Sequence, residues 1–316
     1  MVFSIIIVNY NLSSEVNNCI NSLIKNTNGP EFEIILVDNH SEDLSILKIA
    51  EELSKNTLLS FKFVRTEENI GFGKACNLAV KHSRGELLFF LNPDTIIKEN
   101  ILKRMNKEME KHSLDYNKNI LGLNVSNQKL FDFSAGTFPN YFIEFLNVFS
   151  LGRFAEAAFI KIRSAFSSNR ALKLDWVMGS ALVIGKKSFL KIGEFDPDFF
   201  LFFEEMDLCR RAKNNDMSVL YFPDIRIDHI GSVSAKKNYY FFTKMFYKGK
   251  LLFLKKHSKN LQFYIFQVLL LFHIIFQIVL MYFLMLKNSE KSLGKIRAFR
   301  EILSNLNYPE GISNIP

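Results

Sequence analysis

The first 95 residues of this 316-residue chain contain four polar segments, and each follows an apolar run. The segments are rich in Asn and Asp, whose side chains offer oxygen and amide groups to a ligand. They cover residues 9–11, 38–43, 68–77 and 92–94. Any one of them alone is an ordinary turn or helix cap. Four such segments that meet at one edge of a fold indicate a ligand-binding site instead.

The apolar runs before these segments predict how the segments meet. Each run is rich in β-branched or aromatic residues, and a segment with helical periodicity separates it from the next. The predicted strands are residues 4–8, 33–37, 61–66 and 87–91, and the predicted helices between them are residues 14–26, 44–55 and 74–82. We expect all four strands to be apolar along their length, as burial between two helical layers requires. The pattern predicts an α/β fold with a doubly wound, mostly parallel sheet, whose ligands bind beyond the carboxyl ends of the strands.

The last polar segment, Asn92-Pro93-Asp94, ends its strand abruptly. Pro93 cannot donate a hydrogen bond to a strand ladder. The side chains of Asn92 and Asp94 bring oxygen atoms to the point where the strand leaves the core. The segment is either a plain turn or part of a ligand site.

A second cluster of reactive residues is Glu204-Glu205-Met206-Asp207, directly after the aromatic run FFLFF. The helix macrodipole alone favours acidic residues in a first helical turn, but it does not explain the aromatic residues. Carboxylates beside so many aromatic rings should be partly desolvated. Desolvation raises the pKa of at least one of them and suits it to accept a proton near neutral pH.

The positive charge of the chain is concentrated in its C-terminal third. The net charge is +8, and no Asp or Glu occurs between His229 and Ser289, where lysines crowd the first half. Such a charge suits nucleic acid, an anionic membrane surface or a phosphorylated substrate. The three cysteines, Cys19, Cys76 and Cys209, show no metal-ligand spacing, which favours a reducing cytosolic compartment.

Residues 261–286 contain no formal charge. As a helix, at about 1.5 Å per residue, the segment is long enough to cross a hydrocarbon core of about 30 Å. A narrow polar side and basic residues at both ends argue for an in-plane or re-entrant segment, with the lysine-rich helix before it on anionic lipid. The polar side consists of Gln262, Gln267, His273 and Gln277. A buried helical appendage or a dimer interface is the alternative, and nucleic-acid binding does not explain the uncharged segment.

Seven motifs occur in order between Phe3 and Ser232: SIIIVNYN, VDNHSED, NIGFGKACN, LNPDT, WVMGSALVI, GEFDPDFFLFFEEMDLCRR and DHIGS. The set resembles the bacterial family 2 glycosyltransferases of the GT-A fold, in particular the rhamnosyltransferase-like members. The resemblance implies a GT-A nucleotide-sugar-binding and catalytic domain at residues 1–235. A basic and hydrophobic helical region at residues 236–316, which associates with a membrane, would follow it.

The resemblance also implies the residues that bind the two substrates. The base and ribose of a dTDP- or UDP-linked sugar donor would be held by Asn9, Asp38 and Asn39. The loop beside the nucleotide would contain Asn69, Gly71, Phe72 and Asn77. The acceptor side would be shaped by Trp176, Gly179 and Asp196, although Trp176 is equally compatible with an ordinary core aromatic.

For the metal, the resemblance implies that Asp94 meets Mg²⁺ or Mn²⁺ and that His229 completes the metal or diphosphate site. Many members of the family have Asp-x-Asp at this place. Here Asn92 has a neutral amide in place of the first carboxylate, which weakens any assignment of two-carboxylate coordination. A histidine after a strand is otherwise a packing or capping residue.

For the chemistry, Glu205 aligns with the expected general base of the family's Glu-Asp-x-Asp motif. The change from Asp to Glu leaves open which of Glu204, Glu205 and Asp207 accepts the proton. The implied reaction is a single displacement that inverts the anomeric configuration. No Gln-x-x-Arg-Trp segment occurs, which disfavours the processive synthases of the family.

These expectations together predict an inverting, metal-dependent glycosyltransferase that transfers a sugar, with rhamnose as one candidate, to a lipid-linked saccharide in surface glycan synthesis of the O-antigen or capsule type. We expect it at the cytoplasmic face of the inner or plasma membrane, peripheral or monotopic, without a nucleic-acid partner, and we leave a homo-oligomer open. The alternative is a catalytically silent, membrane-bound nucleotide-sugar-binding protein. A dinucleotide oxidoreductase is disfavoured because NYNLSS, after the first strand, lacks Gly-x-Gly-x-x-Gly.

Overall fold

The computed structural model of the chain describes residues 3–27, 32–126, 134–166, 171–229, 238–284 and 289–305. The chain divides into two compact units. The first consists of Met1–Gly136, Arg163–Pro197 and Glu204–Gly231, and the second of Thr137–Ile162, Asp198–Phe203 and Ser232–Pro316. The predicted domain boundary between residues 235 and 236 lies outside the described residues and stays a prediction. Two segments that precede it in the sequence group with the C-terminal unit.

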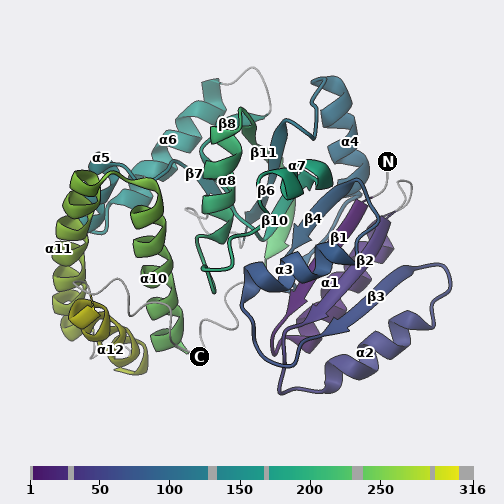
Figure 1. Cartoon of the computed structure of the whole chain (residues 1–316), viewed down its shortest axis with the longest axis horizontal. Coiled ribbons are helices and arrows are strands. Elements are labelled where there is room, and N and C mark those ends of the chain that lie inside the picture. Colours follow the sequence, from purple (N-terminus) through teal and green to yellow (C-terminus); the bar gives the residue numbers. More distant parts are fainter. Residues whose placement is uncertain are drawn as a thin grey trace. The chain divides into compact units, whose positions relative to one another are not determined.

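A mixed, mostly parallel sheet forms the centre of the first unit (Figure 1). Among the described residues, its strands are ordered β3-β2-β1-β4-β10-β6-β11-β5, and β8 pairs with β11. The bounds are β1 (Phe3–Asn9), β2 (Phe32–Asp38), β3 (Ser60–Arg65), β4 (Leu87–Leu91), β5 (Thr95–Ile96), β6 (Asn119–Ser126), β8 (Leu172–Leu174), β10 (Ala181–Gly185) and β11 (Ser218–His229). The first four strands of this order are parallel, whereas β10 is antiparallel to both of its neighbours. A separate antiparallel pair is formed by β7 (Ala135–Gly136) and β9 (Trp176–Val177).

Helices cover both faces of the sheet, as a doubly wound topology requires. One face forms a hydrophobic core with α1 (Ser13–Asn26), α2 (Ser45–Ser54) and α4 (Ile101–Lys111). On the opposite face, α3 (Phe72–Lys81) contacts β1 and β2. There the ring of Phe90 lies 5.3 Å from that of Phe189, in α7 (Lys186–Lys191), and 4.9 Å from that of Phe195. A further helix of this unit, α8 (Glu204–Asn214), precedes β11 in the chain.

One expectation about the strands is wrong. β1 and β4 are buried along their whole length, and so are all but the first residue of β2. β3 instead has exposed Lys62 and Arg65 among half-buried residues. The reason is its place in the sheet: β3 is an edge strand, so one side of its backbone and part of its faces are open to water.

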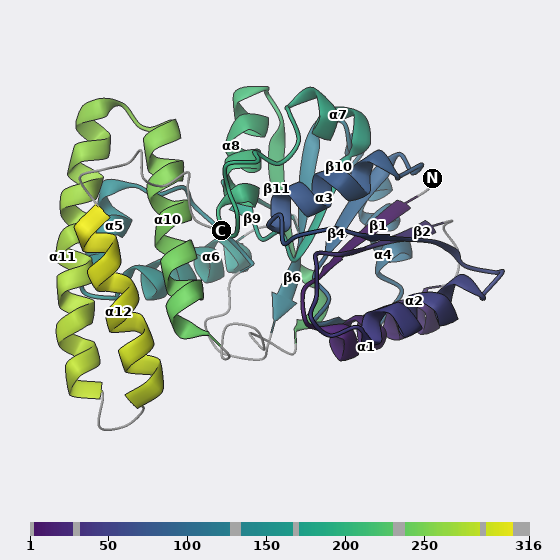
Figure 2. The same ribbon diagram turned by 60° about the horizontal axis from the view of Figure 1, so that its bottom comes forward.

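The second unit is helical (Figure 2). It contains α5 (Tyr141–Val148), most of α6 (Gly152–Phe166), α10 (Tyr239–His257), α11 (Asn260–Leu284) and α12 (Ser289–Asn305). Its core contains Leu251, Leu270, Ile274, Phe299 and Ile302. The predicted uncharged segment is therefore helical through Leu284, and its last two residues lie outside the described ranges. In the described part of the chain, α11 alone is long and apolar enough to cross a membrane, with a mean hydropathy of 2.3.

Candidate functional site

A buried polar network joins the carboxyl ends of β1 and β2. The Asn9 side-chain amide donates to Asp38 Oδ1 at 2.9 Å and to Ser41 Oγ at 3.0 Å, and Asn9 Oδ1 accepts from the main-chain N–H of Leu12 at 3.1 Å. Ser41 Oγ donates to Asp38 Oδ1 at 2.5 Å. Asn9 and Asp38 are both fully buried. Their side chains hold the loops after the strands in place.

Asn39 extends this network to the segment before α3. Its amide donates to Asn69 Oδ1 at 2.8 Å, and its Oδ1 accepts from the Ile70 N–H at 3.0 Å. Asn69 Oδ1 also accepts from the Gly71 N–H at 3.1 Å. Gly71 has a φ of +85°, a backbone conformation that residues other than glycine rarely adopt. The polar segments after β1, β2 and β3 are thus tied together.

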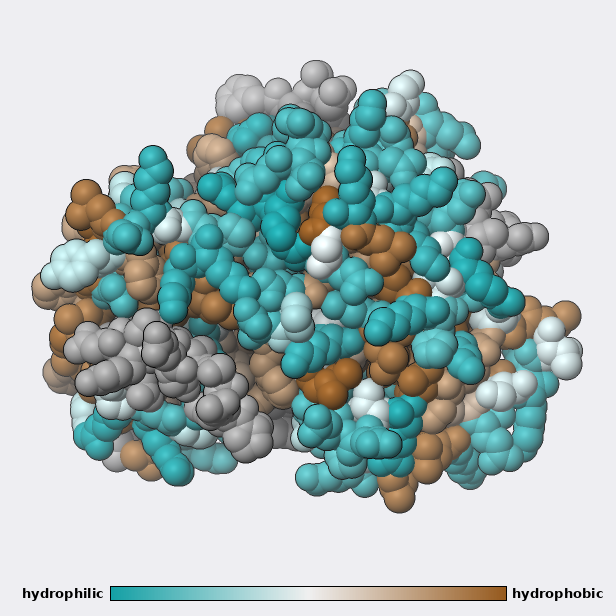
Figure 3. Space-filling model, viewed as in Figure 1, coloured by the Kyte–Doolittle hydropathy of each residue, from teal (hydrophilic) through white to brown (hydrophobic). Residues whose placement is uncertain are grey.

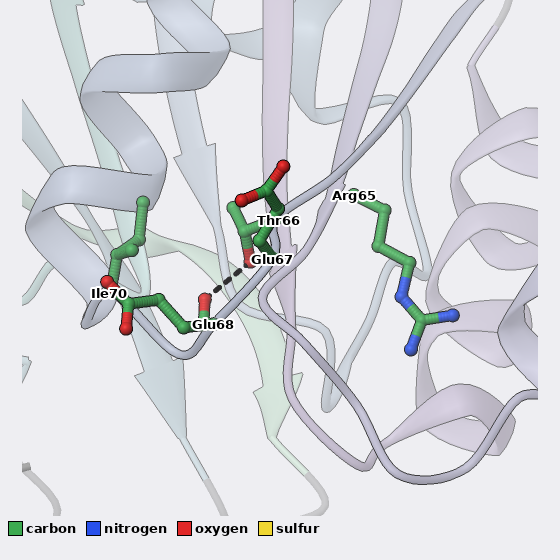
Figure 4. Close-up of a pocket in the computed structure, with 5 residues that line it drawn as sticks. All are labelled: Arg65, Thr66, Glu67, Glu68 and Ile70. Atoms are coloured by element: carbon green, nitrogen blue, oxygen red, sulfur yellow. Dashed lines mark hydrogen bonds between the residues drawn. The ribbon is translucent and has the colours of Figure 1, made fainter.

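A depression of about 650 Å³ lies at the end of β3, beside this network (Figure 4). It is lined by Arg65, Thr66, Glu67, Glu68 and Ile70. Thr66 Oγ1 donates to the Glu68 carbonyl at 2.8 Å, and the Thr66 N–H donates to the Asp38 carbonyl at 3.0 Å. Arg65 Nε lies 3.3 Å from Asp38 Oδ2. Arg65 and Thr66 are not among the residues predicted from the sequence, because the predicted strand runs through residue 66 whereas β3 ends at Arg65.

Asn77 holds the chain that leads to Asp196. Its amide donates to the Phe195 carbonyl at 2.7 Å, and its Oδ1 accepts from the Phe195 N–H at 3.1 Å. Both polar ends of the Asn77 side chain are therefore engaged by one main-chain residue. Asp196, the next residue, is half-buried.

The fourth polar segment, Asn92-Pro93-Asp94, forms a closed turn. Thr95 Oγ1 donates to the Asn92 carbonyl at 2.7 Å, and the Asn92 N–H donates to the Ser180 carbonyl at 3.0 Å. From the other side, the buried Cys19 Sγ lies 3.3 Å from Thr95 Oγ1. The turn that carries Asp94 is thus fixed by groups from α1 and from the segment before β10.

β11 brings His229 to Asp94. Its antiparallel pairing with β5 places His229 opposite Thr95, and His229 Nε2 lies 3.0 Å from Asp94 Oδ2. The two atoms are close but not aligned as a hydrogen bond, and Nε2 is a buried atom without a hydrogen-bond partner in the described ranges. Within those ranges, no group of three or more His, Cys, Asp or Glu is placed to hold a metal ion. The structure therefore offers two side chains of the kind that bind metals.

The acidic segment begins α8, after two residues with strained backbone. Phe202 and Phe203 have φ values of +68° and +71°, which are uncommon for residues other than glycine and often occur at functional sites. The three carboxylates that follow occupy three different environments. The three side chains differ in burial and in their partners, whereas the sequence alone left open which of them accepts the proton.

Glu204 is 4% exposed, and burial together with the charge of neighbouring Glu205 raises its pKa well above the usual range. Asp207 is buried in an ion pair, because Arg211 Nε donates to Asp207 Oδ2 at 2.7 Å. Arg211 also donates to the main-chain carbonyls of Ile192 and Glu194, the latter at 2.6 Å. Asp207 thus anchors the loop before Phe195.

Glu205 is half-buried and lies beside Gly179. A Cβ atom on Gly179 would lie 3.5 Å from Glu205 Cβ and 3.6 Å from a ring carbon of Phe72. The next residue, Ser180, accepts the hydrogen bond from Asn92. Residues 179–180 therefore touch the acidic segment on one side and the Asn92–Asp94 turn on the other. Trp176 is half-buried, in β9, and its ring lies against Gly136.

The first half of this unit matches a known family. Residues 4–127, from β1 to just past β6, match the family model described as Glycosyl transferase family 2. Residues 4–127 are a family 2 glycosyltransferase domain. The enzyme class predicted from the sequence, glycosyltransferase, is confirmed.

Relatives and solved structures extend the similarity beyond the family domain. Rhamnosyltransferase WbbL of Escherichia coli (strain K12) is 26% identical over 236 residues, which cover 72% of this chain and 83% of WbbL. The mannosyltransferase PcManGT of Pyrobaculum calidifontis, in complex with GDP-Man and Mn²⁺, has a TM-score of 0.61 and 11% identity, covering 98% of this chain and 87% of its own. Staphylococcus aureus TarS 1–349, in complex with UDP-GlcNAc, has a TM-score of 0.53 and 18% identity, covering 99% of this chain and 88% of its own.

The similarity to these solved structures shows the fold. The predicted GT-A fold, a mostly parallel sheet flanked by helices and followed by C-terminal helices, is confirmed. The site residues predicted for the glycosyltransferase all lie in the first unit and in the described residues. Their roles remain predictions.

The Asp207–Arg211 pair should be structural in this glycosyltransferase. Replacing Arg211 by Leu leaves the Asp207 carboxylate buried without its partner, so we expect a loss of about 3–5 kcal/mol in the free energy of unfolding. Urea unfolding measures it. The exposed Arg226 in the same unit is the matched control, and Arg226→Leu should change the free energy by no more than about 0.5 kcal/mol. Equal losses in both variants would contradict a special role for the pair.

Glu204 should make stability depend on pH. Its pKa is raised in the folded state by burial and by Glu205, so the folded protein keeps a proton that the unfolded chain releases above about pH 4.3. The free energy of unfolding should therefore fall as pH rises from that value through the folded pKa. Glu204→Gln removes this titration, so the variant should gain stability relative to the wild type as pH rises.

Urea unfolding between about pH 5 and 8 measures this difference, whose slope for one proton is at most about 1.4 kcal/mol per pH unit. Glu110→Gln, at an exposed position of α4, is the control and should follow the wild type. Parallel curves for the wild type and Glu204→Gln would contradict the raised pKa.

Proposed function

We propose that the protein is an inverting, metal-dependent glycosyltransferase that transfers one sugar from a nucleoside-diphosphate-sugar to a lipid-linked saccharide in surface glycan synthesis. One observation carries the proposal. Gly179-Ser180 touches Glu205 on one side and is hydrogen-bonded to Asn92 of the Asn92–Asp94 turn on the other. A base and a candidate metal ligand thus border the same short segment of one unit.

The nucleoside part of the donor would occupy the edge formed by the loops after β1, β2 and β3. The depression beside Asp38 is lined by an arginine, a threonine, two glutamates and an isoleucine, whose polar groups suit the hydrogen-bonding edge of a base and the ribose hydroxyls. Asn9 and Asp38 support this edge from beneath, since both are fully buried. In this assignment, Arg65 and Thr66 join Asn39, Asn69 and Gly71 as donor-side residues.

Asp94 and His229 fit a divalent cation. Adjacent ligands of an octahedral ion, at about 2.1 Å from it, lie about 3.0 Å apart, and Asp94 Oδ2 and His229 Nε2 are separated by 3.0 Å. Mg²⁺ typically takes one or two carboxylates and completes its shell with substrate phosphates and water, so a site with two protein ligands suffices. When bound, the ion would neutralise the charge that develops on the departing diphosphate. Asn92 holds the turn through its main chain and is not needed as a carboxylate.

Among the three carboxylates, Glu205 is the proposed general base. Asp207 is committed to Arg211, and Glu204 is buried with a pKa that favours its neutral form. Glu205 is the half-buried one, and it lies beside Gly179 and Phe72. It would remove the proton from the acceptor hydroxyl, whose oxygen attacks the anomeric carbon from the side opposite the diphosphate. Trp176 and Asp196, both half-buried, would contact the acceptor.

The donor sugar and the location are proposed from the relatives. WbbL is a rhamnosyltransferase, and TarS was solved with UDP-GlcNAc, so dTDP-rhamnose and UDP-linked sugars are the donors to test first. The long apolar helix α11 supports action at the cytoplasmic face of the inner or plasma membrane, where a lipid-linked acceptor presents its sugar. A non-processive transfer, without a nucleic-acid partner, completes the proposal.

The second candidate function is a catalytically silent protein that binds nucleotide sugars at the membrane. The neutral amide at Asn92 and the small number of metal-binding side chains in the described residues favour it. Both candidates bind the donor, and only the first releases nucleoside diphosphate when an acceptor is present. Turnover therefore separates them.

Glu205→Gln should reduce sugar transfer by about 10²–10⁴-fold, because the variant cannot accept the acceptor proton. Release of nucleoside diphosphate in the presence of a lipid-linked acceptor measures the rate. Donor binding, followed by thermal shift with Mn²⁺, should stay within about twofold of the wild type because Glu205 acts on the acceptor. The exposed Glu110→Gln is the control and should keep full activity. Unchanged turnover in Glu205→Gln would refute the assignment of the base.

Removal of the divalent ion by EDTA should abolish transfer, and Mn²⁺ or Mg²⁺ should restore it. Asp94→Ala and His229→Ala should each raise the Mn²⁺ concentration needed for half-maximal activity by about tenfold or more, since loss of one of the two protein ligands weakens binding of the ion by at least about 1.4 kcal/mol. Titration of activity against Mn²⁺ measures this shift. Asp115→Ala, in the loop after α4, is the control and should leave the Mn²⁺ requirement unchanged. Full activity in EDTA would overturn the metal dependence.

A further inference from the structure

The second unit presents an apolar surface to solvent. We propose that this surface, called here the lipid-binding face, lies flat on an anionic lipid bilayer. It is defined by Phe142, Phe145 and Phe149 at α5 and by Phe272, Ile275 and Val279 of α11. The inference deepens the proposed function, on which its biological meaning rests, but its test requires no sugar transfer.

Both halves of the face show the same helical spacing. Phe142, Phe145 and Phe149 are 67%, 54% and 48% exposed, and they recur at i, i+3 and i+7. Phe272, Ile275 and Val279 are 55%, 46% and 50% exposed and recur in the same way. Residues at this spacing lie on one side of a helix. Each helix therefore turns a continuous apolar stripe outward.

The two stripes belong to one surface. α5 packs against α11, with the ring of Tyr141 stacked 5.1 Å from that of Phe266. Phe149, itself half exposed, lies 6.1 Å from the ring of Phe276, the residue after Ile275. Hydrophobic side chains gather along the edge of this unit where α11 lies, at the left of Figures 1 and 3. An exposed apolar surface built from two helices indicates an interaction site.

The polar side of α11 faces its own unit. The two ring nitrogens of His273 are bonded to the Asn147 carbonyl and, at 2.6 Å, to the Tyr247 hydroxyl. The amide of Gln277 donates to Ser150 Oγ. His273 and Gln277, two of the four residues of the polar side predicted from the sequence, therefore face the unit and are satisfied there, whereas Gln262 is exposed. The three residues that define the α11 stripe carry no polar side-chain group that lipid would leave unsatisfied.

α11 lies on the bilayer in this proposal and does not cross it. α12 packs along α11, and Arg300 donates to the Tyr282 hydroxyl at 2.7 Å. A spanning α11 would carry the charged residues of α12, among them Arg297 and Glu301, into hydrocarbon, which is strongly unfavourable. An in-plane helix keeps α12 out of the bilayer. This placement agrees with the in-plane association expected from the sequence.

The net positive charge of the second unit favours anionic lipid as its partner. Its sequence contains fifteen Lys and Arg and six Asp and Glu, a net charge of +9, compared with +8 for the whole chain. Three of its acidic side chains are already paired within the unit: Glu144 with Lys250, Asp198 with Lys256 and Glu301 with Lys244. A second copy of the same unit would be repelled by this charge, whereas anionic headgroups would be attracted.

The lysine-rich helix that the sequence predicts to lie on lipid is α10, and only its middle is buried. α10 buries Leu251, Phe253 and Leu254, and its Lys250 is 7% exposed and paired with Glu144. Its middle is therefore part of the interior of the unit. The lipid-binding face is assigned to α11 and α5, and the placement of α10 on lipid stays a prediction.

The test uses introduced cysteines. Cys19, Cys76 and Cys209 are buried, and burial raises the pKa of Cys19 and Cys209 to about 12, so the native thiols should resist labelling. Phe145→Cys and Phe272→Cys are labelled separately with an environment-sensitive fluorophore in the full chain. Leu58→Cys, at a position of the first unit that is 97% exposed, is the matched control. Vesicles contain phosphatidylcholine alone or mixed with phosphatidylglycerol.

We expect a blue shift at both positions with phosphatidylglycerol vesicles, a reduced shift at high salt, and no shift at Leu58→Cys. A shift at neither position overturns the face, and a shift at Phe272→Cys alone overturns the part assigned to α5. A shift without vesicles that grows with protein concentration identifies a second copy as the occupant and overturns the lipid partner. A label at Phe272→Cys that remains inserted after extraction with salt and alkaline carbonate overturns the in-plane placement.

A second measurement uses the affinity for vesicles. Phe145→Ser with Phe272→Ser should lower the partition coefficient onto phosphatidylglycerol vesicles by about 100-fold, roughly tenfold for each ring removed from lipid. Leu58→Ser should not change it. Stabilisation by a nucleotide sugar with Mn²⁺, followed by thermal shift, should survive in the double variant, so failure of vesicle binding is distinguishable from failure of the proposed function. Unchanged vesicle binding by a folded double variant overturns the proposal.

Discussion

The structure of the site depends on one buried carboxylate. Asp38 has no exposure to solvent, and a buried carboxylate is stable only when hydrogen bonds and opposite charge replace water. Asn9, Ser41 and Arg65 supply these interactions, and each comes from a different segment at the carboxyl end of the sheet. The need to satisfy Asp38 therefore draws the ends of β1, β2 and β3 together. The edge at which we propose the donor to bind is a consequence of that constraint.

The acidic segment shows how one short sequence divides its tasks by environment. Glu204, Glu205 and Asp207 lie within four residues, yet one is buried and favours its neutral form, one is half-buried, and one is locked to Arg211. The helix places their side chains in different directions, since successive residues are about 100° apart around its axis. The sequence predicts proton transfer at this cluster. It could not distinguish the three carboxylates, because their surroundings include α3, β9 and the loop before Phe195, whose contacts with α8 leave no periodic signal in the sequence.

The same limit explains what else could be predicted. The parallel strands, the helices between them and the edge where Asn9, Asp38, Asn39 and Asn69 meet follow from local periodicity and from the topology of βαβ units. The half-exposed character of β3 depends on its place at the edge of the sheet. Arg65 and Thr66 could not be predicted as site residues because the sequence does not show that β3 ends at Arg65. The closeness of His229 and Asp94 arises from the pairing of β11 with β5, whose partners are more than 130 residues apart. Such pairings leave no periodic signal in a single sequence.

The order of the two units along the chain has a consequence for how the enzyme can be divided. Residues Asp198–Phe203 belong to the helical unit, and Glu204 and Glu205 follow them directly. The ring of Phe203 lies 5.3 Å from that of Phe246 and 6.0 Å from that of Phe253, both in α10, and Lys250 of α10 neutralises the buried Glu144. A chain cut before α10 would lose Phe246, Lys250 and Phe253. Glu144 would then lack its cation, and the ring of Phe203, immediately upstream of Glu204, would lack both of these aromatic contacts. The helical region is thus more than a terminal appendage, because it includes the six residues that directly precede Glu204 in the chain.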